Sequence, residues 1–259
     1  MLNYLKSEFY RVARSRDIYV LTIVAALLTV FMNAVLYYCK NFVAGEFRYA
    51  TVRFSLNNML GNLSFMFVGG LIAAVLVFAD EHKNGTMKNA VAYGISRTQF
   101  FIGKCMVASV TASISFIVIE SAHIGTAYLL LENEGPEPLN VLMHGVAAIL
   151  PAAFGAIVLG TAILCCTERL TTVIMIWTTV FYLIPAFCDA LGRKFELFAR
   201  IVRWMPNYQF SHEISGYLGT YQCVWDTPEG LFRCLASGSV ILLLSVVFGI
   251  LAFRRKAIP

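Results

Sequence analysis

Charged side chains are scarce in this sequence: Asp, Glu, Lys and Arg together make up 14% of its 259 residues. An ordinary soluble domain carries roughly 25%. Hydrophobic residues make up 59%, and they form long continuous runs, which are typical of membrane-spanning helices. A membrane β-barrel would instead show short alternating segments. The sequence therefore predicts one all-α integral membrane domain over residues 1–259.

Motifs for catalysis and metal binding are also missing. The string nearest to a Walker A motif, Gly103-Lys104-Cys105, lacks the upstream glycine and the Ser or Thr that would bind magnesium. HExxH and GxSxG are absent, and the seven cysteines include no CxxC pair. We therefore predict no catalytic, cofactor or metal site in this chain. Cys223 and Cys234 fall in one expected outside loop, where their pairing stays open.

Six apolar runs are long enough to cross a bilayer, since about 20 residues at about 1.5 Å rise cover a hydrocarbon core about 30 Å thick. Glycines in the second and fourth runs, such as Gly70 and Gly155, indicate close contacts between helices. The expected spans are 18–38, 59–79, 105–131, 141–166, 170–187 and 235–253.

Basic residues set the expected orientation. If the N-terminus is cytoplasmic, most Lys and Arg residues fall in inside segments, whereas the outside loop 132–138 has three Glu and no basic residue. This asymmetry predicts that both termini lie in the cytoplasm. The net charge of +5 comes from basic residues at the ends of apolar runs and not from one solvated face. It therefore gives no support for nucleic-acid binding.

Two segments outside the spans have an amphipathic pattern. Residues 1–16 alternate apolar and basic positions with a helical period, which predicts a helix along the inner membrane surface, in contact with lipid headgroups. Residues 188–234 lie outside before the last span. Their part 194–205 predicts a short amphipathic helix that ends at Pro206.

The inside segment 80–104 has the features of a docking element. Gly85 suits a tight turn and Ser96 suits a helix N-cap. Phe100 and Phe101 form an apolar cluster beside charged residues, and an apolar centre with a charged rim is typical of a partner interface. The alternative is a solvated loop whose charges only fix the topology.

This segment resembles the first inside loop of the type-2 ABC (ATP-binding cassette) exporter permeases. That loop reads acidic, then Gly-Thr and a basic residue, then Ser-Arg, two aromatic residues and Gly-Lys. In that family the loop forms a coupling helix that docks on a separate ATPase subunit. The matching residues here are Glu81, Gly85, Thr86, Lys88, Ser96, Arg97, Phe100, Phe101, Gly103 and Lys104.

The resemblance covers the rest of the chain as well. Residues 1–16 look like the family's elbow helix and 188–234 like its outer gate region, with Trp204, Pro206, Tyr208 and Phe210 at the gate. It implies a permease subunit of an ATP-driven exporter in a bacterial cytoplasmic membrane. The implied partners are a second copy or a similar permease and two ATPase subunits, which hold ATP and Mg. The implied substrate is a peptide, an antibiotic or a toxin.

Ionisable residues inside the membrane are costly, and the third span carries two of them. Glu120 lies about 22 Å along the helix from Cys105, and His123 is three residues later, on the same face. The pair can share a proton or a hydrogen bond. It is either a structural clasp to Asn33 or Thr161, or a part of the translocation path together with Asn33.

Two other function classes remain open. A secondary transporter or channel would work without an ATPase, although the chain halves show no clear inverted repeat. A membrane-embedded enzyme is the other. Activity of the purified chain without an ATPase would favour either of them.

Overall fold

The computed structural model describes residues 2–43, 47–84, 94–167, 169–212, 214–215 and 222–255, with the backbone alone at 79–84 and 214–215. This part of the chain is a bundle of α-helices, to which one antiparallel pairing of two short strands is added. The chain is thus an all-α membrane protein, as the sequence predicts.

The elements follow in chain order, and π and 3-10 turns are marked η. They are α1 (Leu2–Ala13), α2 (Arg16–Tyr38), η1 (Cys39–Val43), α3 (Val52–Gly61), α4 (Phe65–Asn84), α6 (Arg97–Leu130), α7 (Glu137–Cys166), α8 (Leu170–Thr178), η2 (Thr179–Leu183), α9 (Ile184–Gly192), α10 (Glu196–Val202), α11 (Pro206–Gln209), β1 (Ile214–Ser215), β2 (Gln222–Cys223), η3 (Val224–Asp226) and α12 (Pro228–Arg255).

Six candidate spans result from this order. In the described ranges, five helical stretches are long and apolar enough to cross a membrane, and α3 with α4 passes the same test as a bent pair. The number agrees with the six spans that the sequence predicts. The five stretches are Arg16–Val43, Arg97–Leu130, Glu137–Cys166, Leu170–Gly192 and Pro228–Arg255.

The second span differs from the straight helix expected at 59–79. It is broken between α3 and α4, which meet at an angle of 63°. The cause is local, because the side-chain Nδ2 of Asn62 donates to the carbonyl of Asn58 at 2.7 Å. In a continuing helix the backbone N–H of Asn62 would donate to the Asn58 carbonyl. Here that N–H donates to the carbonyl of Met59 at 3.0 Å instead. The side chain of Asn62 therefore ends α3.

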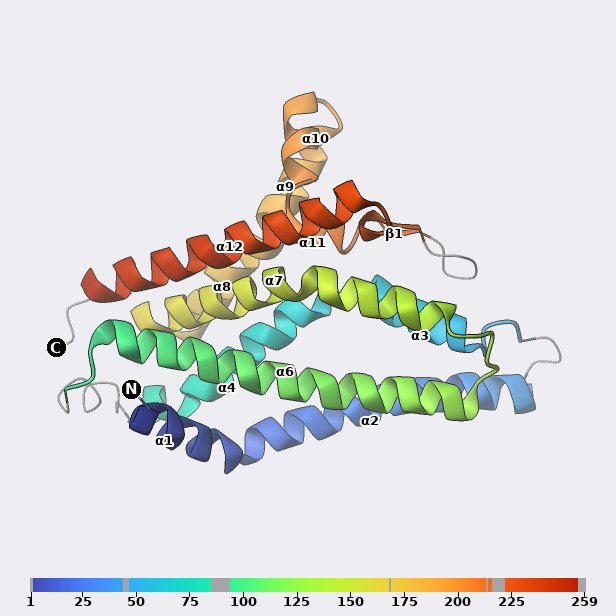
Figure 1. Cartoon of the computed structure of the whole chain (residues 1–259), viewed down its shortest axis with the longest axis horizontal. Helices are drawn as coiled ribbons and strands as arrows, with labels where there is room; N and C mark the ends of the chain where they lie inside the picture. Colours follow the sequence, from blue (N-terminus) through green and yellow to red (C-terminus); the bar gives the residue numbers. More distant parts are fainter. Residues whose placement is uncertain are drawn as a thin grey trace.

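The long helices lie side by side (Figure 1). α12, α7, α6 and α2 follow one another across the bundle, and each contacts the next. α1 and the C-terminal end of α12 lie at the same end, which we call the terminal end; the loop between α6 and α7 lies at the other, the loop end. α9 and α10 stand away from the bundle.

The most deeply buried span is α7, and glycines let its neighbours approach it. A Cβ added at Gly238 of α12 would lie 2.7 Å from the backbone nitrogen of Ala152, and one at Gly155 would lie 2.8 Å from Ile241. On the other side of α7, a Cβ at Gly70 of α4 would lie 2.6 Å from Ile157. The close contacts predicted for the second and fourth spans are therefore present.

The short helix expected before the last span departs from its expected boundaries. The helix expected at 194–205 is α10, which covers only Glu196–Val202, and Met205 caps the next helix, α11.

Cys223 and Cys234 are both buried thiols, and no disulfide joins them in the described structure. Burial, with a smaller contribution from Asp226, raises the pKa of the Cys223 thiol to about 12, so the thiol stays protonated at neutral pH.

The contact between α7 and α12 gives a first prediction. Changing Gly238 to Ala places a Cβ against the backbone of Ala152, so we expect the free energy of unfolding to fall by about 1–3 kcal/mol. Thermal unfolding in detergent measures this. Gly125→Ala on α6 is the matched control, because an added Cβ there meets nothing within 4 Å. Equal stability of the two variants would contradict the close packing.

Candidate functional site

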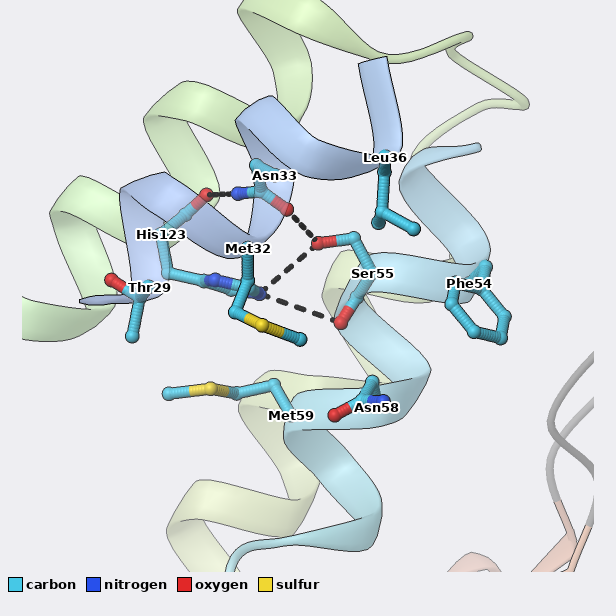
Figure 2. Close-up of a pocket in the computed structure, with 9 residues that line it drawn as sticks. All are labelled: Thr29, Met32, Asn33, Leu36, Phe54, Ser55, Asn58, Met59 and His123. Carbon is cyan, nitrogen blue, oxygen red and sulfur yellow. Dashed lines mark hydrogen bonds between the residues drawn. The ribbon is translucent and has the colours of Figure 1, made fainter. Parts of the chain in front are cut away.

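Three helices bring buried polar side chains together inside the bundle. Asn33 comes from α2, Ser55 from α3 and His123 from α6. Ser55 Oγ lies 2.6 Å from Asn33 Oδ1 and 3.1 Å from His123 Nε2, and Asn33 Nδ2 lies 2.9 Å from the His123 carbonyl (Figure 2). We call these three residues the polar triad. Asn33, one of the two expected partners, thus bonds His123, whereas no hydrogen bond in the described structure joins Thr161 of α7 to Glu120 or His123.

The hydrogen bonds of the polar triad have one consistent direction. Asn33 Nδ2 donates to His123 O and also to Thr126 Oγ1 at 2.8 Å, so its Oδ1 faces Ser55 and accepts from it. A serine hydroxyl has a single hydrogen, so Ser55 Oγ must accept from His123 Nε2. The network therefore assigns a proton to Nε2 of His123, and it closes a ring from that imidazole back to the carbonyl of the same residue.

A cavity of about 120 Å³ lies beside the polar triad. Figure 2 shows the three polar residues on one side of it and the side chains of Met32 and Met59 lying near one another on another. Its wall is thus polar at the triad, Thr29 and Asn58, and apolar at the other lining residues. It is lined by Thr29, Met32, Asn33, Leu36, Phe54, Ser55, Asn58, Met59 and His123.

Glu120 is buried one helical turn before His123 on α6, but it does not bond to that residue. Its side chain is on the same face of α6 and the residue is only 5% exposed. Neither carboxyl oxygen has a hydrogen-bond partner in the described part of the chain. The expected shared proton or hydrogen bond between the two residues is therefore not formed. The two carboxyl oxygens of Glu120 are instead left without a donor.

Ser55 is the member of the polar triad that the sequence did not single out. It lies next to Phe54 at the start of α3, in a stretch that looked like a loop before the second span. The signal was the run of small polar residues that includes Ser55, Asn57 and Asn58 within an otherwise apolar segment. Burial of Ser55 and Asn57 shows that this run faces the protein.

A second group of buried charges lies at the terminal end. Lys104 of α6 is fully buried, and its Nζ donates to Glu8 Oε2 of α1 at 2.7 Å. Arg11 donates to the same oxygen at 2.7 Å and to the carbonyl of Val77 in α4 at 2.7 Å. We call Glu8, Arg11 and Lys104 the ionic clasp, because it joins α1, α4 and α6.

Aromatic rings surround the charge of Lys104. Its Nζ lies 5.2 Å from the ring centre of Phe78 and 5.5 Å from that of Phe100, within the range of a cation–π contact. The expectation that the basic side chains of 1–16 face lipid headgroups therefore needs correction for Arg11. Glu8 and Arg11 point to partners inside the protein instead.

The aromatic pair expected at the centre of a partner surface is inside the bundle instead. Phe100 and Phe101 are each 1% exposed. Phe100 lies between Tyr4 and Phe253, with ring centres 5.8 Å from each, and Phe101 fills the space beside Gly249. The reason is that α6 begins early, at the capping box of Ser96 and Gln99, so these turns pack on α1 and α12. The predicted N-cap at Ser96 is confirmed.

Of the remaining residues in the expected coupling set, two have described contacts and the others do not. Gly103 is buried against Tyr4, and Arg97 Nη1 donates to the carbonyl of Arg254 at 3.0 Å. Glu81 belongs to α4, but its side chain is not described. Gly85, Thr86 and Lys88 lie outside the described residues.

The expected outer gate residues differ in their exposure. Trp204 is exposed, whereas Pro206 and Phe210 are buried. Phe210 stacks on Trp225 with ring centres 5.1 Å apart, and Tyr208 stacks on His212 at 5.1 Å. Phe210 thus belongs to the core, and Trp204 is the residue of the expected gate that is exposed.

The contribution of the polar triad to stability can be tested. Ser55→Ala removes a hydroxyl that both accepts from His123 and donates to Asn33, so we expect thermal unfolding to show a loss of about 1–3 kcal/mol. Ser113→Ala is the matched control, because Ser113 Oγ bonds only the Ser109 carbonyl of its own helix among the described contacts. A loss no larger than that of the control would show that the ring does not hold the helices.

Comparison with known proteins places the chain in a family. The comparison with curated proteins gave no match. The model of the family described as "ABC-2 family transporter protein" matches residues 4–186. The match runs from α1 into α9, and it includes both the ionic clasp and the polar triad. The chain belongs to the ABC-2 family of transporter proteins, as a membrane permease component of an ABC transporter.

Proposed function

We propose that this permease is the membrane subunit of an ATP-driven exporter and that a separate ATPase subunit, in two copies, powers it. The permease acts together with a second copy of itself or with a similar permease. ATP and Mg bind to the ATPase, in agreement with the absence of a Walker A motif here. ATP closes the ATPase pair, and the two permeases alternate between an inward-open and an outward-open arrangement.

The ionic clasp is the observation that carries the coupling part of this proposal. The segment between α4 and α6 connects the two helices directly in sequence. Because Glu8 joins α1 to α6, and Arg11 joins α1 to α4, a force applied to this segment acts on three helices at once. We therefore assign the contact with the ATPase to the segment and the transmission of its movement to the clasp.

The polar triad and its cavity support a translocation path near the loop half of the bundle. Polar and ionisable side chains are rare inside membranes, and they mark transport pathways more often than lipid-facing surfaces. Asn33, His123 and Glu120 are buried on helices that also line or adjoin the cavity. A peptide, an antibiotic or a toxin remains the proposed substrate.

A proton-coupled secondary transporter is the second candidate. The observation that favours it is the unpartnered carboxyl group of Glu120, since such groups carry protons in transporters. Transport by the purified permease that responds to a proton gradient and needs no ATPase would establish this alternative.

The orientation belongs to the same proposal. The terminal end carries basic residues such as Arg14, Arg16 and Arg254, and it corresponds to the cytoplasmic side by the positive-inside rule. We expect cysteines introduced at Asn84 and Glu134, in a background without other reactive thiols, to react with an impermeant reagent from opposite sides of the membrane. Reaction of both from one side would refute the topology.

The coupling role of the clasp can be separated from docking. In Lys104→Met, Glu8 keeps Arg11 as a partner, so we expect the protein to fold and the ATPase still to co-purify. Stimulation of ATP hydrolysis by the permease should fall by about fivefold or more, because α1 no longer moves with α6. An ATPase assay of the reconstituted complex measures this.

Lys6→Met is the control for that assay, because Lys6 is an exposed basic residue on the same helix as Glu8. It should leave both co-purification and stimulation unchanged. Normal stimulation in a stably folded Lys104→Met variant would show that the clasp has no part in coupling.

A further inference from the structure

The cavity of about 120 Å³ beside the polar triad lies between α2 and α3. Four of its nine lining residues belong to each of these helices, and His123 of α6 is the ninth. The hydrogen bond from Ser55 to Asn33 ties the two helices together here, but the side chains around it do not fill the space between them. Met32 is 54% exposed, so one wall of the cavity reaches the surface of the bundle.

The wall of this cavity excludes an ionic ligand. None of the nine lining residues, all of which the structure describes, is Asp, Glu, Lys or Arg. The imidazole of His123 is used by the chain itself, because Nε2 bonds Ser55 and Nδ1 faces the backbone of Thr29. A charge that entered would lose its water and find no opposite charge, which is strongly unfavourable. A group that fits this wall is therefore neutral.

Polar atoms of the wall outside the polar triad also have partners within the chain. The Thr29 hydroxyl donates to the carbonyl of Ala26 at 2.8 Å. The side-chain oxygen of Asn58 accepts from Asn62 at 3.2 Å. Because a polar group that already has a partner gains little from a new one, apolar contact is what holds a group in this cavity.

The size of the cavity and the types of apolar side chain in its wall favour one ring. An engineered apolar cavity of about 150 Å³ holds one benzene molecule, so a partly open cavity of about 120 Å³ suits a single ring. The sulfur atoms of Met32 and Met59 and the ring of Phe54 belong to the wall. Thioether sulfur and aromatic rings both make favourable contacts with another aromatic ring, beyond those that an alkyl group receives.

We infer that this cavity is a binding site for one neutral aromatic ring. Like other small-molecule sites, it is concave and mainly apolar, with a few polar groups. Figure 2 shows Met32 and Met59 on one side of it and the polar triad on another, so the ring lies between these two sides. The inference rests on the proposed function only in taking the ring as part of the transported substrate.

The test is photolabelling of the full chain in lipid nanodiscs with a tritiated phenyl(trifluoromethyl)diazirine, without ATPase or ATP. This neutral probe carries one phenyl ring and dissolves in lipid, so it reaches every lipid-facing surface. We expect labelling at Met32 and Met59 to saturate as the probe concentration rises. Met175 of α8, which is 70% exposed, is the control, and its labelling should rise in proportion to concentration. Proportional labelling at all three methionines would show a crevice filled by lipid and overturn the inference.

Two competitors of matched shape test the preference for an aromatic ring. Toluene has an aromatic ring, and methylcyclohexane has the same carbon skeleton without one. Toluene should remove the saturable labelling at a concentration in the lipid about threefold lower than methylcyclohexane, or lower still. Equal competition by the two compounds would overturn the assignment of an aromatic ring.

A pair of variants locates the ring. Leu36→Phe adds side-chain volume in the wall of the cavity, so the saturable labelling of Met59 should be lost. Leu27→Phe is the matched control, because Leu27 is an exposed residue of the same helix that does not line the cavity. It should keep the saturable labelling. Thermal unfolding shows whether both variants are folded, and unchanged saturable labelling in a folded Leu36→Phe variant would overturn the inference.

Because the assay contains no ATPase, its result does not depend on the coupling proposal. Absence of saturable labelling together with intact ATPase stimulation would remove the ring site alone. Saturable labelling of a permease that no ATPase accompanies would keep the site and remove the ATP-driven mechanism.

Discussion

The structure depends on one constraint: a polar group that enters the apolar bundle must find its partner inside the protein, because lipid offers none. The ionic clasp satisfies this constraint at the terminal end, where Lys104 and Arg11 share one oxygen of Glu8. The polar triad satisfies it further along, where Asn33 and His123 are joined through Ser55. Each group joins three helices, so the pairing of buried polar atoms ties α1 to α4 and α6 at one end and α2 to α3 and α6 further along.

α6 is the element that both groups share. It runs without interruption from Arg97 to Leu130, and Lys104 and His123 lie 19 positions apart on it, about 28 Å along its axis. A continuous helix carries a displacement at one end to the other. On the proposed mechanism, α6 is therefore the physical link between the segment that meets the ATPase and the cavity beside the polar triad.

The sequence predicted what depends on composition and local chemistry, namely six apolar spans and the N-cap at Ser96, and it named Asn33 as one of two candidate partners of His123. It did not predict the bend at Asn62, because one side-chain bond to Asn58 decides it. It also placed Phe100 and Phe101 on a surface. A run of aromatic and basic residues looks the same on a docking face and on a buried face, and only the packing of α1 and α12 distinguishes the two.

The central claim is that this permease works with an ATPase, and the composition of its complex in the native membrane tests that claim most directly. The full chain, tagged and released from its own membrane in mild detergent, should give by native mass spectrometry a particle with two permease subunits and two ATP-binding-cassette ATPase subunits. A particle that contains only copies of this chain, and that transports substrate after reconstitution without ATP, would contradict the account.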